Sequence, residues 1–262
     1  MSQSARNRTI MMLPGAFSGA WSFANFRGHF EAAGWDVLTP ELRYHGQGPG
    51  QPADLRLGQT GLAEYVSDLS GIIKDLRQPP VLLGHSMGGL LAQLLAAKGL
   101  ARAMILLTPA PPWGLLPSSE DEIAAAMGLM SVGPFWDQSL NAAFEIAAEN
   151  SLNCLSPARQ EEIFAQFVPE SGQALFESLF WMFDLGRASY VNAVNVDCPV
   201  LAIAGGRDRV TSPATVRNVA DKYRDLATYL EFEDMGHMLL LEDGWRAVAG
   251  ACGDWLDANL TA

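Results

Sequence analysis

Residues 84–88, GHSMG, combine a serine with the kind of turn that presents a nucleophile. They follow a short apolar run at 81–83 and precede an apolar segment at 90–98, so the serine falls between an expected strand and an expected helix. Glycines at 84 and 88 leave room for a sharp turn that lifts the Ser86 hydroxyl clear of the sheet. The pattern predicts Ser86 as the nucleophile of acyl transfer, with an incidental serine in a glycine-rich turn as the alternative.

A serine hydroxyl needs a base within hydrogen-bond reach, and histidine has a suitable pKa. Of the four histidines, His29 falls in an expected helix, His45 in a loop, and His85 directly before the serine. His237 follows the last expected strand and lies downstream of Ser86, as the chain order serine, acid, histidine requires for this type of turn. We predict His237 as the general base, against a structural surface histidine.

The acid that orients this histidine is expected after an earlier strand. An apolar run at 201–204, two glycines and then Asp208 meet that expectation. Glu233 and Asp234 are rivals, but both lie so near His237 along the chain that a buried contact with its far nitrogen is harder to build. We predict Asp208, whose alternative role is a salt bridge with the arginine at 207 or 209.

The turn LPGAFSGAW at 13–21 closes the first expected strand. Its backbone can offer one N–H to an oxyanion beside the N–H of Met87, the residue after the nucleophile. We expect Ala16 to supply that first donor, and Phe17, next to it, to contact substrate.

Short apolar runs alternate with helix-like segments, the pattern of an α/β protein with a parallel sheet built from βαβ units. We expect strands at 9–13, 36–39, 81–83, 103–107, 199–204 and 227–232. We expect helices at 21–33, 61–76 and 90–98, a helix that begins with Ser212 as N-cap and Pro213 as its first residue, and a last helix after Asp243.

The strand pattern disappears between residues 109 and about 194, where helix-like segments replace it. Ser119 and Glu122 form an expected capping box, and Ser156 with Pro157 marks a second helix start. The segment is rich in aromatic residues, which are more often core than ligand contacts. We name Trp136 and Trp181 as candidate substrate contacts, on a lid with an apolar underside.

The chain resembles the α/β-hydrolase superfamily over nearly its whole length, and more closely the small esterases similar to plant methylesterases and hydroxynitrile lyases. The residues that carry this resemblance are PGA at 14–16, GAW at 19–21, LRYHGQG at 42–48, GHSMGG at 84–89, GRD at 206–208 and GH at 236–237. The resemblance implies a mostly parallel central sheet flanked by helices, with a helical cap inserted after the sixth-strand position. We therefore expect core at 1–110, cap at 111–194 and core again at 195–262.

The chain departs from this family at Pro14, where the family usually has histidine, which affects the conformation of that loop and not its backbone donor. The resemblance also implies that residues 43–48 are structural, so we do not count them as catalytic.

A formal net charge of −12 over 262 residues argues against nucleic acid or an anionic membrane surface as partner. The three cysteines, Cys154, Cys198 and Cys252, show no disulfide or zinc-binding spacing, and we expect buried free thiols. No metal-binding histidine motif is present, which disfavours a metallohydrolase. The N-terminus lacks a signal-like or membrane-spanning apolar stretch, so we expect a cytoplasmic protein without membrane insertion, as a monomer or homodimer.

These features predict a serine hydrolase that cleaves a small, largely apolar carboxylic ester or lactone without metal or organic cofactor. One alternative keeps the same three residues for carbon–carbon bond hydrolysis, lyase, thioesterase or perhydrolase chemistry. Another is a ligand-binding module with little turnover. Epoxide hydrolases and haloalkane dehalogenases of this fold use an aspartate where this chain has Ser86, which excludes them.

Overall fold

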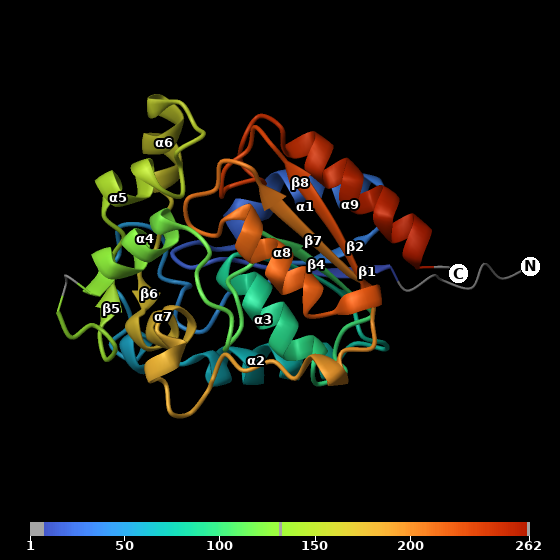
Figure 1. Cartoon of the computed structure of the whole chain (residues 1–262), viewed down its shortest axis with the longest axis horizontal. Helices are drawn as coiled ribbons and strands as arrows, with labels where there is room; N and C mark the ends of the chain where they lie inside the picture. Colours follow the sequence, from blue (N-terminus) through green and yellow to red (C-terminus); the bar gives the residue numbers. More distant parts are fainter. Residues whose placement is uncertain (1–7, 131–132, 261–262) are drawn as a thin grey trace, which may run out of the picture.

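The computed structural model describes residues 8–130 and 133–260. Within them, a six-stranded sheet has the order β2-β1-β3-β4-β7-β8, and every neighbouring pair is parallel (Figure 1). The strands are β1 (Thr9–Leu13), β2 (Asp36–Leu38), β3 (Val81–His85), β4 (Ala103–Leu107), β7 (Val200–Gly205) and β8 (Ala227–Phe232). The predicted α/β class and parallel sheet are confirmed.

The sheet is covered on both faces, which explains why its central strands are continuous apolar runs. Ile10 and Met12 of β1 pack toward α1 (Ala24–Ala32) and α9 (Trp245–Asn259) in one buried cluster. Met11 and Leu13 point to the opposite face, because side chains alternate along a strand. There they join α2 (Leu62–Lys74) and α3 (Met87–Ala96), with α8 (Pro213–Asp221) at the edge of the same layer.

Most predicted helices form close to their expected bounds, with one difference at the first. Its start is a 3₁₀ turn, η1 (Ala20–Phe23), which leads into α1. Helix α8 begins as expected, since the Ser212 hydroxyl accepts the Thr215 N–H and Pro213 occupies the first turn. Further 3₁₀ turns are η2 (Leu57–Gln59), η4 (Ala193–Asn195) and η5 (Arg224–Leu226).

In the segment 111–194, which we call the cap segment, the helices lie beyond the carboxyl ends of the strands (Figure 1), whereas residues 188–193 return along α2 and α3. The cap segment follows β4 and contains α4 (Glu120–Met130), α5 (Phe144–Glu149), α6 (Pro157–Phe164), α7 (Gly172–Leu179) and the 3₁₀ turn η3 (Trp181–Phe183). The predicted capping box at Ser119 and Glu122 and the helix start at Pro157 are both present. One element was not expected: β5 (Ser139–Leu140) pairs antiparallel with β6 (Glu170–Ser171).

Three buried glutamates of the cap segment bind backbone or side chains of the core. Glu122 accepts the Ser212 N–H at the start of α8. Glu177 accepts the Leu62 N–H at the start of α2, at 2.7 Å, and Glu170 accepts the Tyr65 hydroxyl, at 2.8 Å. Two of these carboxylates thus satisfy free N–H groups at helix N-termini, where negative charge is favourable. We call the three residues the anchor glutamates.

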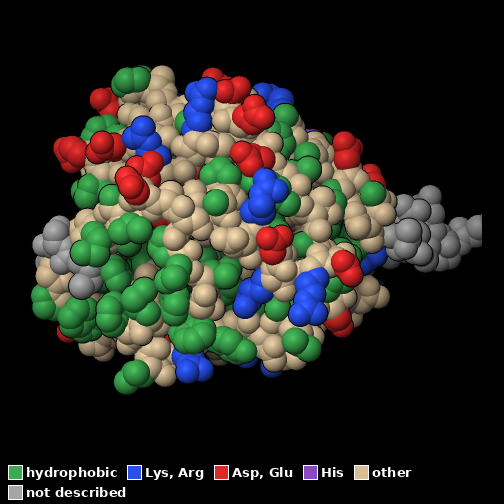
Figure 2. Space-filling view, in the orientation of Figure 1, with side chains coloured by type: hydrophobic (Ala, Val, Ile, Leu, Met, Phe, Trp, Pro, Cys, Tyr) green, Lys and Arg blue, Asp and Glu red, His purple; other side chains and the backbone are tan. Residues whose placement is uncertain are grey.

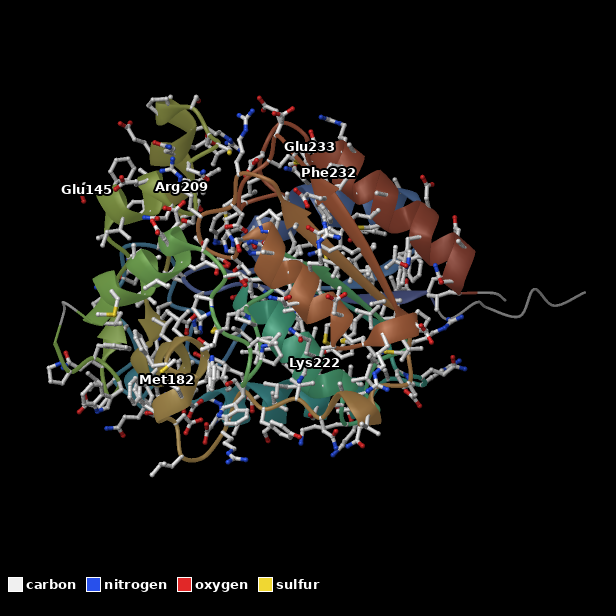
Figure 3. The ribbon with its side chains drawn as sticks, viewed as in Figure 1. Glu145, Met182, Arg209, Lys222, Phe232 and Glu233 are labelled. Atoms are coloured by element: carbon white, nitrogen blue, oxygen red, sulfur yellow. The ribbon has the colours of Figure 1, made fainter. Side chains whose placement is uncertain are left out.

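Part of the outer face of the cap segment, over α4, α7 and η3, is apolar, as the green side chains in Figure 2 show, whereas acidic and basic side chains gather over α5 and α6. Met182, labelled in Figure 3, lies on this face and is 52% exposed. Other exposed apolar side chains of the segment are Leu116, Ile123, Met127, Phe183 and Leu185. Among the residues that the structure describes, no helix combines the length and apolar character needed to span a bilayer.

Candidate active site

Ser86 lies between β3 and α3 in a backbone conformation that side chains rarely adopt, with φ 52° and ψ −120°. Its N–H donates to Leu107 of the neighbouring strand and its carbonyl accepts from Ala110, so the turn is held from the side of β4. The residue is half-buried. The side chain of the predicted nucleophile is therefore held on a strained turn at the carboxyl end of the sheet.

The two glycines of this turn are required by close backbone approach. A Cβ at Gly84 would collide with the carbonyl of Gly88, and a Cβ at Gly88 would collide with the carbonyl of Leu13. The sequence interpretation, that both positions make room for a sharp turn, agrees with these contacts.

Asp208 and His237 meet as the sequence predicts. Oδ2 of Asp208 lies 2.8 Å from Nδ1 of His237, and both side chains are almost fully buried. The other carboxylate oxygen accepts the backbone N–H groups of Val210 and Thr211, at 2.7 and 2.9 Å. The acid is thus fixed by its own loop, and it fixes the imidazole with Nε2 turned away from it.

The loops that carry these two residues touch backbone to backbone. A Cβ at Gly205 would collide with the carbonyl of Gly236, and Arg207 N–H donates to the Met235 carbonyl at 2.8 Å. The glycine that ends β7 is therefore what brings Asp208 within reach of His237.

One of the two rival acids, Asp234, and both arginines beside Asp208 have other partners. Arg207 pairs with Asp234, and both side chains are exposed. Arg209, labelled in Figure 3 where the loop after β7 faces α5, donates to the Glu149 carbonyl at 3.1 Å. Asp208 is left to the histidine.

No hydrogen bond joins Ser86 to His237 among the described residues, and Nε2 of His237 has no partner there. The two are neighbours through His85, whose Nε2 donates to the His237 carbonyl at 3.0 Å and whose ring centroid lies 4.9 Å from that of His237. Thr108 donates to the same carbonyl at 3.1 Å. Such contacts often form or tighten only when substrate binds, so the free Nε2 is suited to receive a proton.

His85 itself is neutral at physiological pH. Burial, and then the proximity of His237, lower its pKa to about 3. Its proton must therefore lie on Nε2, which donates, while the buried Nδ1 has no partner among the described residues. His85 therefore adds no charge beside His237.

Glu242 is a residue that the sequence reasoning missed. Its buried carboxylate accepts the Gly236 N–H, at 2.9 Å, directly before His237. Burial raises its pKa, against the effect of that hydrogen bond. The only signal in the sequence is a charged residue that ends the apolar run 238–241.

The oxyanion turn, residues 14–18, lies against the Ser86 turn. A Cβ added to Gly15 would lie 3.0 Å from Cβ of Ser86. The N–H groups of Ala16 and Met87 donate no hydrogen bond within the described residues, and Met87 is the first residue of α3, where such groups are normally free. Their role as donors to an oxyanion stays a prediction.

The candidate pocket residues lie in different surroundings. Phe17 packs against a cap cluster of Phe135, Leu175 and Phe180. Trp136 is 42% exposed, and Trp181 packs on Trp113, with ring centroids 5.2 Å apart. Of the three proposed substrate contacts, Phe17 alone belongs to the turn beside Ser86.

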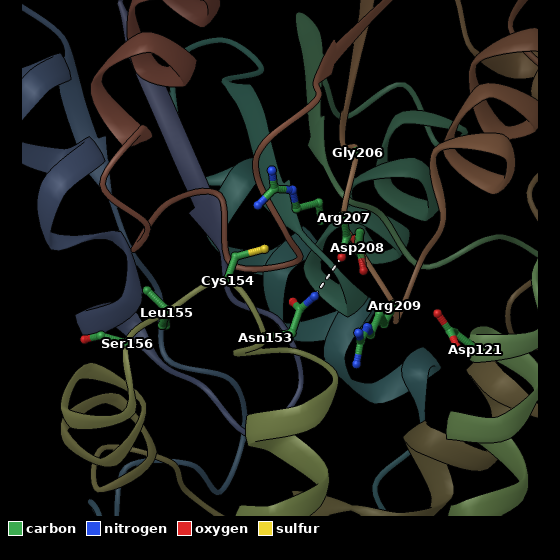
Figure 4. A pocket seen from close by; sticks show the side chains of 9 residues that line it. All are labelled: Asp121, Asn153, Cys154, Leu155, Ser156, Gly206, Arg207, Asp208 and Arg209. Carbon is green, nitrogen blue, oxygen red and sulfur yellow. Dashed lines mark hydrogen bonds between the residues drawn. The ribbon is translucent and has the colours of Figure 1, made fainter.

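A polar cleft of about 630 Å³ lies on the outer side of the Asp208 loop (Figure 4). Its wall includes Arg207, Arg209 and Asn153, and the Asn153 amide donates to the Arg207 carbonyl at 2.8 Å. Cys154, also in this wall, is partly exposed, contrary to the expectation of three buried thiols, whereas Cys198 and Cys252 are buried. Ser86 and His237 do not line this cleft.

Among the described residues, no group of three or more histidine, cysteine, aspartate or glutamate side chains is arranged to hold a metal ion.

The chain belongs to the alpha/beta hydrolase family, whose sequence model matches residues 10–251. No curated protein matches it at the sequence level.

Solved structures give the same fold. The chain is similar to a methylesterase from Arabidopsis at 15% identity and a TM-score of 0.70, with 95% of this chain and 98% of that one covered. It is similar to a monoacylglycerol lipase from Paleococcus ferrophilus at 20% identity and a TM-score of 0.68, with 96% and 95% covered. A pyrethroid hydrolase from Sphingobium faniae matches at 21% identity and a TM-score of 0.67, with 95% and 97% covered. At these identities the likeness concerns the fold.

Proposed function

We propose that this protein is a serine hydrolase that cleaves a small, largely apolar carboxylic ester through an acyl-enzyme on Ser86. The observation that carries the proposal is the buried 2.8 Å contact between Asp208 and Nδ1 of His237, with Nε2 left free beside a strained serine turn. Family membership and the methylesterase, lipase and pyrethroid hydrolase of similar fold support hydrolysis of an ester.

The reaction begins when the Ser86 oxygen attacks the ester carbonyl and Nε2 of His237 takes the hydroxyl proton. Asp208 stabilises the imidazolium, and the N–H groups of Ala16 and Met87 bind the negative oxygen of the tetrahedral intermediate. His237 then protonates the leaving alcohol, and the acyl group stays on Ser86. Water repeats the sequence against the acyl-enzyme and releases the carboxylic acid.

An apolar acyl or alcohol group suits the surroundings of the oxyanion turn. Ala16 and Phe17 pack against the cap cluster of Phe135, Leu175 and Phe180. Burial of apolar surface against such side chains gives roughly 25 cal/mol per Å². We therefore expect kcat/KM to rise with acyl length until the space under the cap is filled.

The test is covalent labelling with a fluorophosphonate combined with turnover of p-nitrophenyl esters of increasing acyl length. We expect one adduct, on Ser86, together with steady hydrolysis, and neither in Ser86→Ala. Ser67→Ala, which removes an exposed serine on α2, is the matched control and keeps both. Unchanged turnover in Ser86→Ala, or no adduct and no turnover in the unmodified chain, contradicts the proposal, and the second result favours the ligand-binding alternative.

A further inference from the structure

A second buried pair of histidine and carboxylate lies behind the oxyanion turn. Nε2 of His45 is 3.2 Å from Oε2 of Glu170, and both side chains are shielded from solvent. The other oxygen of Glu170 accepts the Tyr65 hydroxyl at 2.8 Å and the Ser171 N–H at 2.7 Å. This carboxylate comes from β6 of the cap segment, whereas its two side-chain partners belong to the core.

Both ring nitrogens of His45 act as donors. Nδ1 is 2.9 Å from the Arg43 carbonyl, which can only accept, and Nε2 faces the Glu170 carboxylate. Burial alone lowers the pKa of His45, but the charge and hydrogen bond of Glu170 outweigh it and raise the pKa to about 9. Burial alone raises the pKa of Glu170, but the His45 charge and the hydrogen bonds from His45, Ser171 and Tyr65 together outweigh burial and lower the pKa. The pair is therefore an imidazolium and a carboxylate.

The same carboxylate reaches the oxyanion turn. Oε2 of Glu170 lies 3.4 Å from the Phe17 nitrogen, and the Phe17 carbonyl accepts the Val168 N–H at 3.0 Å. Phe17 has a φ of 61°, which is costly for a residue with a side chain. The backbone of this strained residue is thus held at both ends by the segment 168–170.

Ala16 lies between two peptide planes that are fixed by these contacts. On one side, the Gly15 carbonyl accepts the Ser18 hydroxyl at 2.9 Å. This carbonyl shares its plane with the Ala16 N–H, which points the opposite way. On the other side, the plane between Ala16 and Phe17 is held through the Phe17 N–H. These two peptide planes together set the direction of the Ala16 N–H.

We propose that Glu170 is a positioning residue for the oxyanion turn: held by His45 and Tyr65, its carboxylate fixes the Phe17 peptide and so aims the Ala16 N–H at the oxyanion. The inference rests on the proposed function, since it assumes acyl transfer at Ser86. It assigns Glu170 a part in stabilising the transition state through the turn, without contact with substrate.

Glu177 provides the matched control. It is another anchor glutamate, it is 9% exposed, and it also accepts a core N–H, that of Leu62 at 2.7 Å. No described hydrogen bond connects it to the oxyanion turn. A role of Glu170 in stability alone predicts equal effects of Glu170→Gln and Glu177→Gln.

The experiment measures kcat and KM for a p-nitrophenyl ester and the inhibition constant of an alkyl trifluoromethyl ketone, which forms a tetrahedral adduct with serine. We expect Glu170→Gln to lower kcat roughly tenfold and to change KM by no more than about twofold. This decrease in kcat is smaller than the decrease that follows removal of a whole oxyanion donor. The inhibition constant rises by the same factor as kcat falls. Glu177→Gln leaves all three within about twofold.

Wild-type kcat and inhibition in folded Glu170→Gln overturn the inference, and so do equal losses in both variants. If Glu170→Gln does not fold, Tyr65→Phe takes its place, because it removes one hydrogen bond from Glu170. We expect Tyr65→Phe to cause a smaller change in kcat and in the inhibition constant, with KM unchanged. Wild-type values of kcat and of the inhibition constant in Tyr65→Phe overturn the inference.

A second readout does not depend on turnover. Amide hydrogen exchange at Phe17 and Val168 accelerates in Glu170→Gln and not in Glu177→Gln if Glu170 holds the turn. Equal exchange in the two variants overturns the inference. A chain that neither hydrolyses esters nor labels at Ser86 refutes the proposed function, whereas the exchange measurement still decides whether Glu170 fixes the turn.

Discussion

Two buried pairs of histidine and carboxylate lie at the carboxyl end of the sheet, and they differ in how many ring nitrogens are occupied. His237 binds Asp208 through Nδ1 and keeps Nε2 free. His45 uses Nδ1 for the Arg43 carbonyl and Nε2 for Glu170. The first arrangement leaves a site for a proton to arrive, and the second leaves none. This difference matches the roles we propose for the two pairs, a base in one place and a support in the other.

The charges around the two histidines differ as well. His237 has a neutral histidine, His85, beside it, whose pKa is lowered to about 3. His45 faces the buried carboxylate of Glu170, and a further acid, Glu41, also raises its pKa. A permanently protonated histidine suits a structural role, whereas a general base must be able to release the proton that it takes up.

The largest effect is expected when the first pair, His237 and Asp208, loses its histidine. His237→Gln removes the base, and we expect kcat for a p-nitrophenyl ester to fall by about 10⁴-fold or more. His29→Gln, which alters a helix histidine that packs on Phe30, leaves kcat within twofold. A residual rate in His237→Gln near that of the wild type rejects the assignment of the base.

The next effect separates the predicted acid from its rival. Asp208→Asn keeps the side-chain shape but no longer stabilises the imidazolium, so we expect kcat to fall about 10³- to 10⁴-fold. Asp234→Asn breaks only an exposed pair with Arg207, and kcat stays within twofold. Stopped-flow assays with equal amounts of folded protein give the comparison, and the reverse ranking refutes the choice of Asp208.

The pH dependence of stability tests the second pair. His45 has a raised pKa, so its contribution to stability is complete below its ordinary pKa near 6.5 and is lost as the pH rises through about 9. Glu170 has a lowered pKa, so its contribution is lost as the pH falls below its ordinary range. We expect the urea midpoint to decrease between pH 8 and pH 10, as measured by circular dichroism.

Two variants isolate this contribution. In Glu170→Gln the decrease is absent, because His45 no longer has the carboxylate that raises its pKa. Loss of one partner of a buried ion pair also lowers the free energy of unfolding at pH 7 by about 3 kcal/mol. Glu177→Gln keeps the decrease above pH 8. The same pH profile in all three proteins contradicts an ionised pair.

The smallest expected effect compares two buried tyrosines. Tyr65→Phe removes a hydrogen bond to the charged Glu170, and we expect a loss of about 2 kcal/mol in the free energy of unfolding. Tyr223→Phe removes a hydrogen bond of the same 2.8 Å length to neutral Gln93, and we expect about 1 kcal/mol. If the free energy of unfolding, measured in urea, falls equally in the two variants, Glu170 carries no charge.

Local signals in the sequence predicted most of the core. The expected strands at 9–13 and 227–232 agree with β1 and β8 residue for residue. Asp208 was predicted because it follows an apolar strand and a glycine turn, and in the structure those glycines lie where two loops approach closely. The start of the first helix differs, because a short 3₁₀ turn precedes α1.

The cap segment was less predictable, because its important contacts are between residues far apart in the chain. β5 and β6 contain two residues each, too few for a recognisable alternation. Glu170 is buried by partners 105 and 125 positions away, and its own neighbours in the sequence do not distinguish it from a surface glutamate. The roles of Trp136 and Trp181 stay predictions for the same reason.

The anchor glutamates also bear on the engineering of chimeras of this protein. A chimera that replaces the cap segment with that of another hydrolase removes Glu122, Glu170 and Glu177 together. The N-termini of α2 and α8 then lose acceptors for their N–H groups, and the charge of His45 has no partner. Transplanted caps should therefore carry glutamates at the three matching positions, or the recipient core should be redesigned at those three places.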